Sequence, residues 1–212
     1  MTARKSGLGG RTGRPREPSG GLVRIVSGGQ TGADRAALNW AIARGISHGG
    51  WCPKGRKAED GPIPRRYQLM ETPSASYLQR TELNVRDSDG TVILSLAETL
   101  TGGSRRTAEL ARQYGKPWLH LAKSAGGRDA GALLRRFLRQ HDIHVLNVAG
   151  PRASTEPEVG EFVTSVLERA FPRPSGAAAF RVAQTSRAPD GEARSRTPSP
   201  RSANPPRASS RS

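Results

Sequence analysis

The residues of this chain that could do chemistry are concentrated in short glycine-rich stretches. The first is SGGQTGAD at 27–34, which follows an apolar segment and precedes a helical pattern. Glycines leave backbone N–H groups accessible, and a helix N-terminus adds unpaired N–H groups and partial positive charge. Such a turn binds anions such as phosphate, although a turn that merely saves space is the alternative. The candidate ligand-binding residues here are Gly28, Gly29, Gln30, Thr31 and Gly32.

Two further stretches of the same kind are TGGS at 101–104 and NVAGPRAS at 147–154. Gly102 and Gly103, with Ser104 as the expected N-cap of the next helix, would form a second wall of an anion site. Glu109 falls on that helix. It is the one weak catalytic candidate, because a carboxylate at this position is more simply explained as facing solvent.

The stretch WCPKGRKAEDG at 51–61 is rich in reactive residue types. Lys54 and Arg56 could bring positive charge to a phosphate. Cys52, the single cysteine, could act as a thiolate ligand or as a small buried hydrophobe. The four histidines are scattered, so we expect no structural zinc site.

The elements that must position these stretches alternate between strands and helices. Apolar patterns predict strands at 22–27, 46–51, 91–96, 118–121 and 143–148, and helices at 33–44, 78–86, 104–114, 128–140 and 156–170. This alternation predicts an α/β fold, a Rossmann-like open parallel sheet with helices on both faces. Ligands of such sheets bind at the carboxyl ends of the strands, where all three glycine-rich turns fall. Residues 52–77 hold four prolines and no sustained period, which predicts a long structureless, functional loop.

Composition divides the chain of 212 residues into a folded part and two basic ends. Residues 1–21 and 172–212 together carry ten of the sixteen net positive charges and few apolar residues, so we expect both to be disordered. Residues 22–171 are then a single domain. The basic ends favour weak, nonspecific contact with polyanions, with a specific nucleic-acid or signalling role as the alternative. One cysteine, no apolar run that could span a membrane and no secretory signal favour a cytoplasmic protein.

Several ordered segments together resemble a known family. GGQTGAD, GGWCPKGRKAEDGPIP, RTELNVRDSDGT, TGG before a helix and NVAGPRAS are similar to the molybdenum carrier family over about residues 23–170. That family belongs with the LOG-type phosphoribohydrolases and related DNA-processing proteins among Rossmann-like domains. The resemblance implies a homo-oligomeric carrier whose small anionic ligand is molybdenum cofactor, the phosphorylated molybdopterin. It favours a binding protein over an enzyme.

The same resemblance supplies the alternative function. LOG-type enzymes have a PGGxGT turn followed by a catalytic glutamate, whereas this chain has TGGSRRTAE, with threonine for proline and without the GT pair. Glu109 would correspond to the glutamate. A nucleotide or phosphoribosyl hydrolase, with Glu109 or Asp34 as the acid–base group, is therefore the second hypothesis.

Overall fold

The computed structural model describes residues 22, 24–126 and 129–173. All the helices and strands given below lie in the unit Met1–Pro172. The expectations for the arm at 1–21, and for nearly all of the tail at 172–212 with its polyanion contact, lie outside the described residues.

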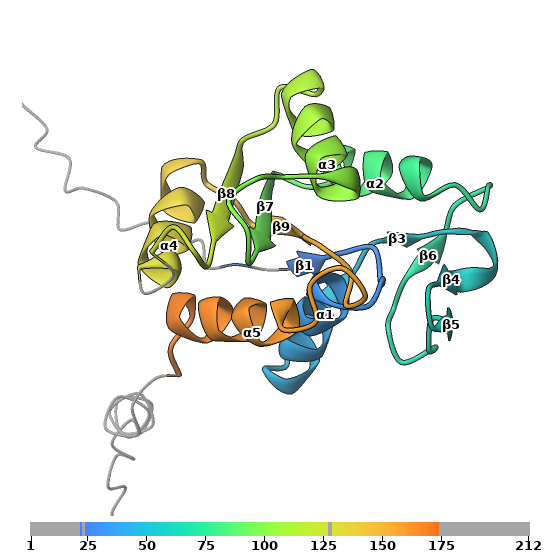
Figure 1. The fold of residues 1–212 in the computed structure, drawn as a ribbon, viewed down its shortest axis with the longest axis horizontal. Coiled ribbons are helices and arrows are strands. Elements are labelled where there is room, and N and C mark those ends of the chain that lie inside the picture. The colour runs from blue at the N-terminus through green and yellow to red at the C-terminus, as the bar shows by residue number, and fades with distance from the viewer. Residues whose placement is uncertain (1–21, 23, 127–128, 174–212) are drawn as a thin grey trace, which may run out of the picture. The chain divides into compact units, whose positions relative to one another are not determined.

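The centre of the fold is a five-stranded, wholly parallel sheet in the order β2-β1-β9-β7-β8. Figure 1 shows α2 and α3 on one face of this sheet and α1 and α5 on the other. The predicted Rossmann-like α/β class is therefore confirmed. The strands are β1 (Arg24–Val26), β2 (Ser47–Gly49), β7 (Gly90–Ser95), β8 (Trp118–Ala122) and β9 (Val145–Ala149). The helices are α1 (Ala33–Ala43), α2 (Tyr77–Arg86), α3 (Gly102–Gln113), α4 (Ala130–Gln140) and α5 (Val159–Ala170).

Burial follows the sequence pattern. Every residue of β7 is buried, as expected for a central parallel strand covered on both faces. The largest core cluster joins β1, β7 and β9 to α1, α4 and α5, with Trp40, Leu134 and Phe162 among its members. No helix in the described ranges is both long and apolar enough to cross a bilayer.

The helix expected from Ser104 begins two residues earlier than the sequence pattern suggested. Thr101, in an extended conformation, is the N-cap of α3, so the prediction that Ser104 caps this helix is wrong. Gly102 takes a φ of +49° at the first helical position, which costs a glycine little. Ser104 therefore lies inside the first turn of α3.

Residues 52–77 are ordered, and the prediction of a structureless loop is wrong. β3 (Trp51–Cys52) pairs in parallel with β6 (Met70–Glu71), and β4 (Lys57–Ala58) pairs antiparallel with β5 (Gly61–Pro62). A short 3-10 turn, η1 (Lys54–Arg56), lies between β3 and β4. A second core lies beneath these pieces and includes Leu38 of α1; its other members are Cys52, Ala58, Ile63, Tyr67 and Leu69. Cys52 thus packs as a small hydrophobe, and burial raises the pKa of its thiol.

The guanidinium of Arg56 holds this segment together. It donates to the carbonyl oxygens of Ile63 (2.8 Å), Leu69 (3.2 Å), Pro64 (3.0 Å) and Tyr67 (3.0 Å). One side chain therefore satisfies four main-chain acceptors that a regular ladder would otherwise pair. Because these four contacts come from one side chain and not from a repeat, they leave no periodic signal in the sequence.

Candidate ligand-binding site

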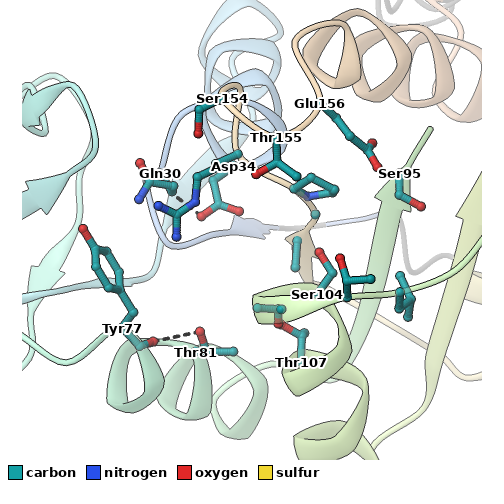
Figure 2. A pocket seen from close by; sticks show the side chains of 18 of the residues that line it. Gln30, Asp34, Tyr77, Thr81, Ser95, Ser104, Thr107, Ser154, Thr155 and Glu156 are labelled. Atoms are coloured by element: carbon teal, nitrogen blue, oxygen red, sulfur yellow. Dashed lines mark hydrogen bonds between the residues drawn. The ribbon is translucent and has the colours of Figure 1, made fainter. Parts of the chain in front are cut away.

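A cavity of about 420 Å³ lies at the carboxyl ends of the strands (Figure 2). All three glycine-rich turns contribute to its wall, as the parallel topology requires. In Figure 2, Gln30 and Asp34 face Tyr77 and Thr81 of α2. Ser104, in the first turn of α3, also lines the cavity. Nine of the twenty lining residues carry a hydroxyl group, so the wall is rich in groups that can donate or accept a hydrogen bond.

The glycines of the first turn allow other parts of the protein to pack closely against its backbone. A Cβ on Gly28 would overlap the guanidinium of Arg80, and one on Gly32 would lie 2.6 Å from the carbonyl oxygen of Pro151. A Cβ on Gly29 would lie 2.5 Å from Leu69. Close internal packing therefore accounts for the small residues of this turn, and none of the three glycines lines the cavity.

The turn that leads into α1 already holds a carboxylate, which comes from the first turn of that helix. Oδ2 of Asp34 accepts a hydrogen bond from the backbone N–H of Gln30 (3.2 Å) and one from Nη1 of Arg80 (3.0 Å). Both side chains of this ion pair are largely buried. Burial raises the pKa of Asp34, against the opposing effects of Arg80 and the Gln30 N–H. A second anion at this turn would have to compete with this carboxylate.

Glu59 joins the loop to two of the glycine-rich turns. Its carboxylate accepts hydrogen bonds from the hydroxyl of Thr31 and from the hydroxyl of Ser154 (2.5 Å). Thr31 Oγ1 in turn accepts the N–H of Ala153 (3.1 Å). Thr31 therefore acts as a link between turns, outside the cavity lining.

These contacts predict a pH-dependent stability. Desolvation raises the pKa of Glu59, but hydrogen bonds from Ser154 and Thr31 and the charge of Arg152 outweigh it, so this pKa lies below the ordinary 4.5. A lowered folded-state pKa stabilises the fold above about pH 4.5, and this stabilisation is lost as the pH falls through the lowered value. We expect Glu59→Gln to cost about 1 kcal/mol at pH 7 and progressively less below pH 4, measured by urea unfolding. A cost that does not change with pH would contradict the assignment.

The N-terminus of α3, unlike that of α1, is open to the cavity. No described residue accepts a hydrogen bond from the backbone N–H groups of Gly102, Gly103 or Ser104. A Cβ built on either glycine would meet no atom within 4 Å, so the space beside them is free. Three unpaired N–H groups and the positive end of a helix dipole form a site suited to an anion.

The comparisons with known proteins agree with this architecture. Residues 25–171 match the family described as the circularly permutated YpsA SLOG family. The chain belongs to this family. It is also similar to the crystal structure of a protein named "Putative molybdenum carrier protein", from Syntrophus aciditrophicus SB, at 49% sequence identity and a TM-score of 0.69. That match covers 71% of this chain and 95% of the other. A search of the curated proteins gives no match.

Family membership confirms the resemblance seen in the sequence, and the structure places the candidate residues of this YpsA SLOG protein. Gln30, Gly102, Gly103 and Ser104 line the cavity, whereas Lys54 and Arg56 lie outside it in the loop. Glu109 also lies outside the cavity, where it pairs with Arg105 (2.9 Å) and Arg106 (3.1 Å). Hydrogen bonds from these two arginines lower the pKa of Glu109.

Most of the other cavity residues were not predicted from the sequence, Tyr77 and Arg152 among them. The guanidinium carbon of Arg152 lies 5.9 Å from the centroid of the Tyr77 ring, and that of Arg80 lies 6.0 Å from it. Arg152 could have been found, because it stands in the third glycine-rich turn. Tyr77 left no such signal. Among the residues that the structure describes, no three His, Cys, Asp or Glu side chains form a cluster that could hold a metal ion.

Proposed function

We propose that this chain binds and carries molybdenum cofactor, or a similar phosphorylated anionic ligand, in the cavity. The observation that carries the proposal is the open N-terminus of α3, where the N–H groups of Gly102, Gly103 and Ser104 have no acceptor among the described residues. The ligand's phosphate would bind there, and Gln30 would contact another part of the ligand. Support also comes from the neighbour of 49% identity that is named as a molybdenum carrier.

The lining residues fit a ligand of this kind. The volume of about 420 Å³ falls in the range of roughly 300–1,000 Å³ typical of small-molecule sites. Molybdenum cofactor would bring a phosphate and an oxo-metal centre, both rich in hydrogen-bond acceptors, to a wall rich in hydroxyl and N–H donors. The charged groups of the wall balance, with two guanidiniums and two carboxylates. Attraction of an anion therefore relies on the end of α3 and on directed hydrogen bonds.

Arg152 is the lining cation with the most freedom to turn toward a ligand. Its side chain is 46% exposed, and its nearest carboxylate oxygen, on Glu59, lies 3.7 Å away. Arg80 is instead committed to the buried Asp34. We therefore propose Arg152 as an additional contact to the anionic end of the ligand.

The hydrolase hypothesis receives less support. Glu109 is not among the residues that line the cavity, and it is held by two arginines. Asp34 lines the cavity but is tied to Arg80 and to the backbone of Gln30. We therefore favour carrying over catalysis. The homo-oligomer and the cytoplasmic location expected from the sequence stay predictions.

Substitution of Gly103 by aspartate tests the proposal. A side chain at this position meets nothing in the protein, and a carboxylate in the first turn of a helix is stabilising by about 0.3–1 kcal/mol. The fold should therefore be kept while an anionic ligand is repelled. We expect Gly103→Asp, purified from a host that makes molybdopterin, to retain at most roughly one tenth of the pterin held by the unsubstituted chain, a difference of about 1.4 kcal/mol. Released pterin is measured by fluorescence.

The matched control is Gly103→Asn, which has nearly the same shape without the charge and should retain most of the pterin. Thermal unfolding of both variants checks that the fold is intact. The proposal is overturned if the unsubstituted chain carries no pterin and does not protect added cofactor. It is also overturned if Gly103→Asp carries as much pterin as Gly103→Asn.

A further inference from the structure

The side-chain amide of Gln30 has a fixed orientation. Its Oε1 accepts hydrogen bonds from the backbone N–H groups of Thr31 and Glu59, both at 3.0 Å. Backbone N–H groups can only donate, so the amide oxygen must face them and the amide cannot be flipped. The residue is 6% exposed, and its other end, the Nε2 amino group, is therefore held in one direction.

No described residue accepts a hydrogen bond from this amino group. Nε2 of Gln30 is buried and has no acceptor among the described residues, and Nε of Arg80 is in the same situation. Both residues line the cavity, and Asp34 anchors the guanidinium of Arg80 at 3.0 Å. Buried donors in native proteins are nearly always paired, because leaving one unpaired costs free energy.

These donors differ in character from those of α3. The end of α3 offers several N–H groups at the positive end of a helix, which suits a charged oxyanion. Gln30 offers a neutral donor of fixed direction, on the part of the cavity wall formed by the first turn and α2. A neutral, directed donor of this kind selects an acceptor such as a carbonyl oxygen, and it disfavours an amino group at the same position because two donors would then face each other.

We infer that Gln30 is the specificity-determining residue of the cavity. It selects phosphorylated ligands that present a carbonyl acceptor to its Nε2, while the phosphate binds at α3. This inference rests on the proposed function and deepens it, because it names the chemical group by which the ligand is recognised. It does not depend on the metal.

The test uses two purine nucleotides that differ in the group at C6 and in the proton on the neighbouring N1. Inosine 5′-monophosphate carries a carbonyl at C6, and adenosine 5′-monophosphate carries an amino group there. We expect the full-length chain to bind the inosine nucleotide more tightly, and Gln30→Glu to shift the ratio of the two dissociation constants by roughly tenfold toward adenosine, as measured by calorimetry. Glutamate keeps the acceptor for Thr31 and Glu59 but turns an acceptor toward the ligand. Its added charge repels both phosphates equally, so it cancels in the ratio.

Gln79→Glu is the matched control. Gln79 lies outside the cavity, where its Oε1 accepts from the N–H (3.1 Å) and hydroxyl (3.0 Å) of Ser74. This variant makes the same charge change and should leave the ratio as it is in the unsubstituted chain. Thermal unfolding shows whether each variant folds.

A second measurement needs no variant and covers the case in which Gln30→Glu does not fold. In ¹⁵N-labelled protein, the NH₂ signal of Gln30 should shift on titration with the inosine nucleotide and stay in place with inorganic phosphate alone. The inference is overturned if the ratio of dissociation constants is the same in Gln30→Glu and the unsubstituted chain, or if bound inosine nucleotide leaves that signal in place. It is also overturned if neither nucleotide binds while pterin copurifies, a result that leaves the proposed function standing. Absence of pterin, by contrast, counts against the proposed function alone.

Discussion

Replacement of Arg80 by methionine is expected to lower the free energy of unfolding by about 3–5 kcal/mol at pH 7. Methionine keeps much of the apolar volume but leaves Asp34 as a buried carboxylate without its cation. Arg80 and Asp34 are both largely buried, so solvent cannot replace the lost partner. Urea unfolding, followed by circular dichroism, measures the loss.

Acid should reduce this loss. Removal of Arg80 takes away an interaction that lowers the pKa of Asp34, so the folded-state pKa, already raised by burial, rises further. A raised carboxyl pKa penalises the folded state in full above that pKa, and the penalty shrinks as the pH falls from there toward the ordinary value of 3.8. The double variant Arg80→Met, Asp34→Asn should recover part of the stability at pH 7, because an amide has no charge to bury. A double variant as unstable as the single one would show that Arg80 acts through packing instead.

Gly32→Ala is expected to destabilise the fold more strongly than the same change at another glycine with a positive φ. Gly32 has a φ of +74°, and its Cβ would lie 2.6 Å from the Pro151 carbonyl oxygen and 2.7 Å from the Ala153 nitrogen. Main chain cannot swing aside as the end of a side chain can. Overpacking of this kind costs about 1–3 kcal/mol. The backbone of Gly32, with φ +74° and ψ −125°, also lies outside the left-handed helical region, so alanine is strained there as well.

Gly45→Ala is the comparison variant. Gly45 has a φ of +64°, but a Cβ there would meet nothing within 4 Å. Its replacement should show the cost of a positive φ without any steric overlap. Equal losses at Gly32 and Gly45, measured by urea unfolding, would mean that the first and third glycine-rich turns can move apart, and the close packing described for them would then be wrong.

The parallel sheet was predictable because its signals are local. The apolar run of β7 and the spaced apolar positions of α1 arise from neighbours in sequence, and their alternation implies a parallel topology. The convergence of three turns at one edge of the sheet then follows from geometry. The predicted helix start at Ser104 was wrong because Gly102 can adopt a φ that most residues avoid.

The uses of particular side chains were not predictable, because they depend on partners far away in the sequence. The group that fills the space beside Gly28 is Arg80, and nothing near Gly28 in the sequence indicates it. Arg56 was predicted to bind a phosphate. It donates instead to main-chain carbonyl oxygens, which every residue has and which therefore leave no mark in the sequence. The orientation of the Gln30 amide depends on Glu59 in the same way.

Asp34 places a negative charge of the protein itself at the first strand-to-helix turn, where Rossmann-like folds commonly bind a phosphate. Under the proposed function, the phosphate of the ligand is therefore bound at the N-terminus of α3 and not at the first turn. Binding of a phosphate by one helix end is weaker than binding by two, so the proposed ligand would be released more readily.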